Sequence, residues 1–138
     1  GLKFTSIPSL FEENLEKSSF SGPSEYAKET ARQKALEVYH RVKETAQPHL
    51  VVAVDTVVFA DEKIIEKPKD EKDAFQMIKS FSGRTHSVHS GVALLKPNTS
   101  KSDEEHYSIL QFDEVTKVTF GSLTDEIIKT YVATKEPL

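Results

Sequence analysis

Apolar residues return at three- and four-residue intervals in the first third of the chain. After Gly22-Pro23 they are Ala27, Ala31, Ala35, Val38 and Val42. This spacing places them on one helix face, and glycine followed by proline is typical of a helix cap and first turn. We expect a helix from Pro23 to about Thr45, preceded by a strand over 3–7 and an acidic, irregular stretch over 9–17.

The strongest strand pattern lies in the middle of the chain. The run 50–59 is almost continuously apolar and β-branched, which is typical of a central strand covered on both faces. The polar residues 60–63 predict a hairpin that returns through Ile64 and Ile65. Asp70 followed by Asp73 resembles a capping box, so we expect a helix that ends at Gly83.

The remaining pattern alternates between strand and helix. Strands are expected over 85–95 and 107–120, an exposed loop over 96–104, and a last helix from Ser122 or Thr124 to about Ala133. Strands and helices that interleave in this way predict an α/β fold: one domain over 1–138, with a mixed central sheet and flanking helices.

Composition narrows the class of protein further. The 138 residues contain no cysteine, which excludes disulfides and thiolate chemistry, and the net charge of −4 offers no general attraction to nucleic acid or to anionic membranes. The longest apolar run is too short to cross a bilayer, so we expect a cytoplasmic protein without nucleic-acid or membrane partners. The sequence has no Walker loop, dinucleotide fingerprint or nucleophile elbow.

Asp55 is the most informative single residue. It lies inside the apolar run, where removing a carboxylate from water costs several kcal/mol unless a partner offsets it. Asp55 could cap a turn or pair with a buried base, or it could bind a metal or act as a general base. The neighbouring Thr56 could add a hydroxyl to such a site or be an ordinary strand threonine.

Two lysines are placed where they could reach this carboxylate. Lys34 lies beside the apolar stripe of the first helix, from which a long side chain can extend into a cleft. Lys67 follows the hairpin that returns along the Asp55 strand. Lysines next to a carboxylate suit a site for phosphate and metal; taken alone, each could equally be a solvated surface residue.

Five segments together resemble the Maf family in their order and spacing. They are Glu29–Ala35, Val54–Val57, Glu66–Pro68, Phe81–Val88 and Gly91–Ala93. The resemblance covers nearly the whole chain and is strongest to the eukaryotic Maf-like domain that is joined to an acetylserotonin methyltransferase-like module.

The resemblance implies a cleft and the hydrolysis of nucleoside triphosphates to monophosphate and pyrophosphate, with Mg²⁺ or Mn²⁺ as cofactor. It assigns Asp55 as catalytic base or metal-associated carboxylate, and places Lys34, Lys67 and Thr56 in the substrate site. The acidic residue after the first strand, which would also approach the metal, corresponds to Glu13. Such enzymes clear surplus or non-canonical nucleotides; dTTP, UTP or modified nucleotides are the expected substrates.

Family segments at both ends of the domain are absent from this sequence. The Ser-x-Ser-x-Arg-Arg loop would precede Gly1, and the Lys-Ala-Gly and Tyr-Gly-Ile-Gln segments would follow Pro137. We therefore expect a domain truncated at both ends, which leaves two classes of function open: a pyrophosphatase, or a catalytically inactive nucleotide-binding or interaction module. An unpaired sheet edge left by the truncation would favour self-association, so a homodimer is a further expectation.

Overall fold

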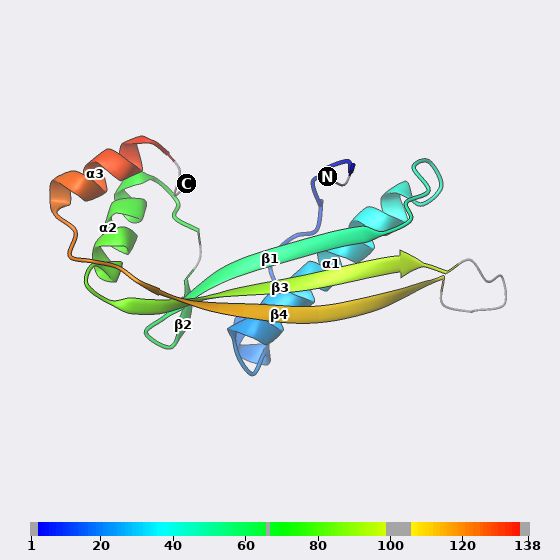
Figure 1. Ribbon diagram of the computed structural model, residues 1–138, viewed down its shortest axis with the longest axis horizontal. Helices are drawn as coiled ribbons and strands as arrows, with labels where there is room; N and C mark the ends of the chain where they lie inside the picture. The colour runs from blue at the N-terminus through cyan, green and yellow to red at the C-terminus, as the bar shows by residue number, and fades with distance from the viewer. Residues whose placement is uncertain (1–2, 66, 99–105, 136–138) are drawn as a thin grey trace. The chain divides into compact units, whose positions relative to one another are not determined.

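The computed structural model describes residues 3–65, 67–98 and 106–135 (Figure 1). The chain divides into two compact units, each built from separate stretches of sequence. The first unit comprises Gly1–Thr56 and Ser90–Glu114, and the second comprises Val57–His89 and Val115–Leu138. The expectation of one domain over 1–138 stays a prediction.

The strands form a four-stranded sheet in the order β2-β1-β3-β4. Their bounds are Val51–Ala60 (β1), Lys63–Ile65 (β2), Thr85–Pro97 (β3) and Tyr107–Thr119 (β4). The α/β class is confirmed, and the four strands run antiparallel, where a mixed sheet was expected. The long strands β1, β3 and β4 each pass through both units.

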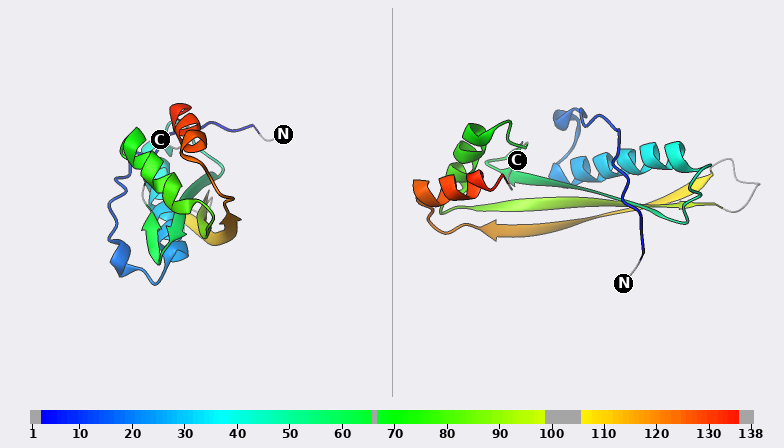
Figure 2. Two further views of the ribbon diagram at one scale, coloured as in Figure 1. Left: turned by 90° about the vertical axis from the view of Figure 1, so that its left-hand side faces the viewer. Right: turned by 90° about the horizontal axis from the view of Figure 1, so that it is seen from above.

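In the first unit, one long helix covers one face of the sheet. Helix α1 (Pro23–Val42) begins at Gly22 with proline in its first turn, as the sequence predicts. Its small apolar side chains allow close packing against β3, and Figure 2 shows α1 lying along the strands. The buried core of this unit consists of Ala31, Ala35, Tyr39, Ala93 and Leu95.

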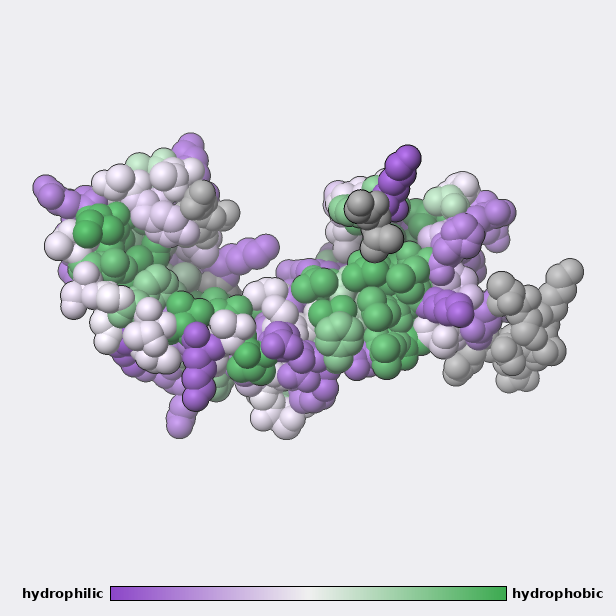
Figure 3. Space-filling model, in the orientation of Figure 1, coloured by the Kyte–Doolittle hydropathy of each residue, from purple (hydrophilic) through white to green (hydrophobic). Residues whose placement is uncertain are grey.

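The other face of the sheet in this unit is apolar and exposed. Val52 and Val54 of β1 are 56% and 49% exposed, so the prediction that this strand is covered on both faces was wrong. Side chains alternate between the faces of a strand, and among the described residues α1 covers only the face that carries Val51, Ala53 and Asp55. Figure 3 shows the apolar surface that results.

In the second unit, the turn between two strands and the starts of both helices form where short sequence patterns predict them. Asp61 and Glu62, with φ of 51° and 61°, make the tight turn between β1 and β2. Helix α2 (Glu71–Phe81) begins at Asp70, whose carboxylate accepts the N–H of Asp73, and Thr124 caps α3 (Asp125–Ala133) in the same way. The two helices pack through Ala74, Ile78, Ile128 and Val132.

Two sequence predictions differ from the structure, one in the segment before α1 and one in the loop after β3. Residues 3–16 form no regular strand, so the strand expected over 3–7 was wrong. The loop expected over 96–104 starts later, because Lys96 and Pro97 still belong to β3; its remainder from 99 on lies outside the described residues. A short 3-10 turn, η1 (Lys17–Ser19), leads into α1.

Candidate active site

One lysine joins two carboxylates in the first unit. The Nζ atom of Lys34 lies 2.8 Å from Oε1 of Glu13 and 3.4 Å from Oδ1 of Asp55. The three residues come from the segment before α1, from α1 and from β1. The structure therefore brings together three of the five residues that the sequence placed in the site.

The burial of these groups decreases from the strand outwards. The side chain of Asp55 is 12% exposed, that of Lys34 is 22% exposed and that of Glu13 is 43% exposed. Asp55 lies on the face of β1 that α1 covers, and Lys34 follows the buried Ala31 on that helix, so its side chain extends along the sheet to the carboxylate. The cost of burying Asp55 is thus offset by a cation, the partner that the sequence required.

The electrostatic environment of Lys34 favours its charged form. Burial lowers the pKa of Lys34, but the hydrogen bonds and negative charges of Glu13 and Asp55 outweigh burial and raise this pKa above its usual value. Lys34 is therefore a permanent ammonium at neutral pH. Two carboxylates thus share the ammonium of Lys34.

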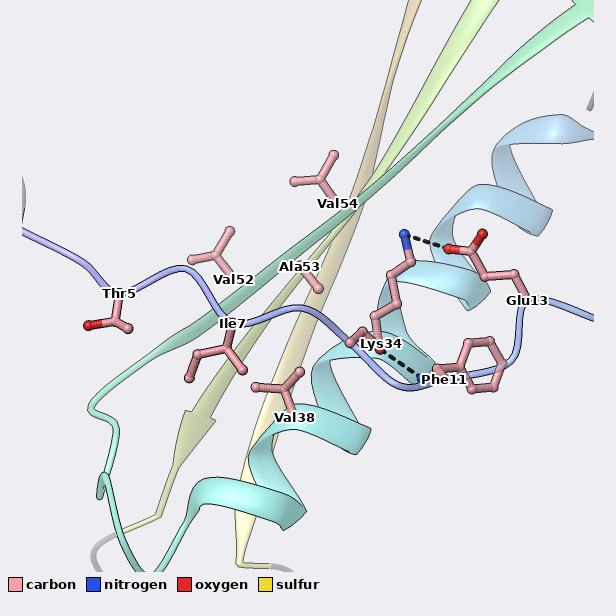
Figure 4. A pocket seen from close by; sticks show the side chains of 10 residues that line it. Thr5, Ile7, Phe11, Glu13, Lys34, Val38, Val52, Ala53 and Val54 are labelled. Carbon is pink, nitrogen blue, oxygen red and sulfur yellow. Dashed lines mark hydrogen bonds and ion pairs between the residues drawn. The ribbon is translucent and has the colours of Figure 1, made fainter. Parts of the chain in front are cut away.

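A pocket of about 330 Å³ opens beside this cluster (Figure 4). It lies between β1, α1 and the extended segment before the helix. Alternate residues of that segment face it, which is the two-residue period of an extended chain. The pocket is lined by Thr5, Ile7, Ser9, Phe11, Glu13, Lys34, Val38, Val52, Ala53 and Val54. Polar and apolar side chains both contribute to its walls, and the charged groups stand at one end.

Of the other two predicted residues, Thr56 lies outside the cluster, and Lys67 belongs to the second unit. Thr56 follows Asp55 in β1 and so faces the opposite side of the sheet, where its hydroxyl lies 2.9 Å from that of Ser90. Lys67 is an exposed residue of the second unit. Its approach to Asp55 stays a prediction.

Sequence reasoning missed two residues that hold the pocket together. Glu37 and Arg41 of α1 bind the backbone of the segment that carries Glu13. The only signal for them was their four-residue spacing, which normally indicates a solvated ion pair on one helix. Their long-range contacts could not be read from that spacing.

The cluster fits a divalent cation in part. Glu13 and Asp55 direct carboxylate oxygens at one point, and Mg²⁺ is commonly bound by one or two carboxylates together with substrate phosphates and water. No group of three or more His, Cys, Asp or Glu side chains with metal-binding geometry occurs within the described ranges. Substrate oxygens would therefore have to complete the coordination.

The comparison with known families places the chain in one of them. The family model described as Maf-like protein matches residues 1–138, so the chain belongs to the Maf-like family. The chain is 44% identical, over all of its length and 22% of the other protein's, to a human protein named probable bifunctional dTTP/UTP pyrophosphatase/methyltransferase. That name agrees with the resemblance to the methyltransferase-linked eukaryotic domain.

Bacterial relatives are also named as dTTP/UTP pyrophosphatases. A Clostridium perfringens dTTP/UTP pyrophosphatase is 39% identical over 99% of this chain and 65% of its own length. A Clostridium botulinum dTTP/UTP pyrophosphatase is 41% identical over 83% of this chain and 55% of its own length. The chain thus spans less than two thirds of each of these relatives.

Proposed function

We propose that the protein acts as a nucleoside triphosphate pyrophosphatase, which cleaves the bond between the α- and β-phosphates to yield a monophosphate and pyrophosphate. The observation that carries the proposal is the Glu13–Lys34–Asp55 cluster at one end of a pocket. Support comes from relatives named dTTP/UTP pyrophosphatase.

Each residue of the cluster has a distinct role in this reaction. Asp55 accepts a proton from a water molecule as that water attacks the α-phosphorus, and pyrophosphate leaves with the electrons of the broken P–O bond. Lys34 orients Asp55 and presents positive charge to the phosphates. Glu13 and Asp55 would hold Mg²⁺ or Mn²⁺, which supplies charge neutralisation to the triphosphate when bound.

The apolar part of the pocket suits the organic part of the substrate. Ile7, Phe11 and Val38 could contact a base or sugar while the phosphates lie towards Lys34. By the relatives' names, dTTP and UTP are the proposed substrates.

Thr56 and Lys67 are proposed as additional substrate-binding residues, and a cytoplasmic homodimer is the proposed form. No helix within the described residues is long and apolar enough to cross a membrane.

The test is a pyrophosphate-release assay over a panel of nucleoside triphosphates with Mg²⁺ or Mn²⁺. It should include dTTP, UTP, dCTP, GTP and a methylated guanosine triphosphate. The expected result is metal-dependent release, fastest with dTTP and UTP. Absence of release from every nucleotide, by protein that carries the family's flanking segments and is shown to be folded, would rule the proposal out.

A second function is favoured by the charge of the cluster. A single ammonium faces two carboxylates, so the described cluster does not by itself neutralise a triphosphate. A nucleotide-binding or interaction module without catalysis is the alternative. Nucleotide binding in calorimetry without any pyrophosphate release would favour that alternative.

A further inference from the structure

Three side chains of α1 form a ladder along the segment that carries Glu13. Lys34, Glu37 and Arg41 follow one another at three- and four-residue spacing, so they lie on one stripe of the helix. Arg41 contacts Pro8, Glu37 contacts Ser9 and Leu10, and Lys34 contacts Glu13. The segment therefore runs antiparallel to the helix from residue 8 to residue 13.

The contacts of Glu37 and Arg41 are directed at the backbone of the segment. Oε1 of Glu37 accepts the N–H of Leu10 at 2.6 Å and lies 3.5 Å from the Ser9 hydroxyl. Arg41 donates through Nη2 to the Pro8 carbonyl at 2.8 Å and through Nε to Oε2 of Glu37 at 2.9 Å. These two residues therefore clamp the backbone of the segment on both sides of Ser9.

The ionisation of Glu37 reflects this arrangement. The hydrogen bonds from Arg41, followed by those from the Leu10 backbone and by the positive charge of Arg41, lower the pKa of Glu37 to about 2. Charge-assisted hydrogen bonds of this kind are stronger than neutral ones. The clamp is thus fully formed at neutral pH.

Within the part of the chain that the structure describes, this segment is not fixed by strand pairing, and several of its side chains are exposed. Residues 3–16 pair with no strand among the described residues, and Phe4 and Leu10 are 87% and 69% exposed. Glu13 lies only three residues beyond Leu10, and its carboxylate reaches Lys34 at 2.8 Å. Release of the clamp would let Glu13 move away from Lys34 and the pocket.

We propose that Glu37 and Arg41 are positioning residues that hold Glu13 against Lys34 at the mouth of the pocket. The inference rests on the proposed function for its catalytic consequence. Glu37 touches neither phosphate nor metal in this account. Glu37 acts through Glu13. A substitution of Glu37 should therefore have no further effect on activity once the Glu13 carboxylate has been removed.

The first experiment is a double-mutant cycle on pyrophosphate release, using the protein with its flanking family segments. Glu37→Ala is expected to lower kcat/KM by about tenfold or more, since small misplacements of a positioned group have effects of this size. In a Glu13→Ala background, Glu37→Ala should change kcat/KM by less than about twofold. Equal losses in both backgrounds would overturn the proposal, because Glu37 would then act independently of Glu13.

Matched variants separate positioning from stability. Glu25→Gln removes another carboxylate of α1, one that is ion-paired with Lys28 rather than with the segment, and should leave kcat/KM unchanged. Glu37→Gln keeps an oxygen for the Leu10 N–H and should recover part of the activity that Glu37→Ala loses. A Glu37→Gln variant no better than Glu37→Ala would contradict the role of that backbone contact.

The second experiment does not depend on activity. In ¹⁵N-lysine-labelled protein, the NMR signal of the Lys34 side chain should shift in Glu37→Ala in the same direction as in Glu13→Ala, and stay unchanged in Glu25→Gln. An unaltered Lys34 signal in Glu37→Ala would overturn the positioning role. If wild-type protein releases no pyrophosphate, the proposed function fails, and the Lys34 signal still decides whether Glu37 positions Glu13.

Discussion

The side-chain nitrogen of Lys34 and a carboxylate oxygen of Asp55 lie 3.4 Å apart, and this contact joins α1 to β1. It couples the only charged residue of β1 to a residue of α1 that lies 21 positions earlier in the chain. Asp55 is largely buried, and the ammonium of Lys34 offsets the cost of burying its charge. Substitutions at the two positions should therefore have different consequences.

Asp55→Asn should abolish pyrophosphate release while the fold is retained. The amide removes the base, and general-base catalysis commonly contributes about 10²- to 10⁴-fold. It also removes a buried charge, so the melting temperature should change little. Kinetics and thermal unfolding measured side by side provide the check, with Asp113→Asn on β4 as a carboxylate control. Near-normal turnover in Asp55→Asn would refute its assignment as base.

Lys34→Ala and Lys67→Ala should weaken triphosphate binding more than they lower stability. A lysine that faces phosphate contributes to binding more than to packing. Lys34→Ala should show some loss of stability as well, because it leaves Glu13 and Asp55 without their shared cation. Calorimetric titration with a triphosphate and metal is the measurement, and Lys43→Ala at the end of α1 is the control. Unaltered affinity in both variants would make the two residues ordinary surface lysines.

Gly91→Ala should disrupt the packing of α1 on β3. A Cβ atom at Gly91 would lie 2.3 Å from backbone atoms of Ala27 and Lys28, and neither can move without displacing the helix. We expect a loss of about 3 kcal/mol or more in the free energy of unfolding, at the upper end of the usual cost of overpacking. Gly121→Ala meets nothing within 4 Å and should be tolerated. Equal stability of the two variants in urea denaturation would contradict this packing.

Glu37 should contribute to the acid sensitivity of the fold. Its pKa is about 2 in the folded protein and near its ordinary value of 4.5 in the unfolded chain. A lowered pKa stabilises the fold at pH values above the unfolded pKa, and this contribution is lost as the pH falls from about 4.5 towards 2. In Glu37→Gln the free energy of unfolding should decline less steeply over that interval than in wild type. Identical slopes would show that Glu37 is not held by these hydrogen bonds.

A polypeptide limited to residues 1–138 should bind triphosphate weakly and release little pyrophosphate. Polypeptide that adds the family's Arg-Arg and Tyr-Gly-Ile-Gln segments should be active, since a guanidinium can fix phosphates that one shared lysine does not. The edge of β1 over 51–56 has no second neighbouring strand among the described residues, because β2 pairs only with Val58–Ala60. The short chain should therefore also be less stable and associate.

Parallel assays at matched concentration, together with light scattering, provide the comparison. Equal activity of the two polypeptides would show that the flanking segments are dispensable and that the assignment of the site is wrong. Inactivity of both would favour the module without catalysis.

Much of the fold could be predicted because its signals are local. The cap at Gly22-Pro23, the Asp70 cap of α2 and the turn after Ala60 each depend on residues a few positions apart, and all three form as expected. Asp55 could be identified as a site residue for a similar reason. A carboxylate inside an apolar run requires a partner, whatever that partner is.

The sequence by itself determined that the carboxylate of Asp55 would need a partner, and that helices and strands would alternate around it. Only the tertiary structure decided that Lys34 supplies this cation and shares it with Glu13, that β1 is covered on one face, and that Glu37 and Arg41 bind the segment before α1. Patterns of three or four residues report which face of an element is apolar. They carry no information on which distant backbone atoms that face will meet, because such contacts arise only when the whole chain has packed.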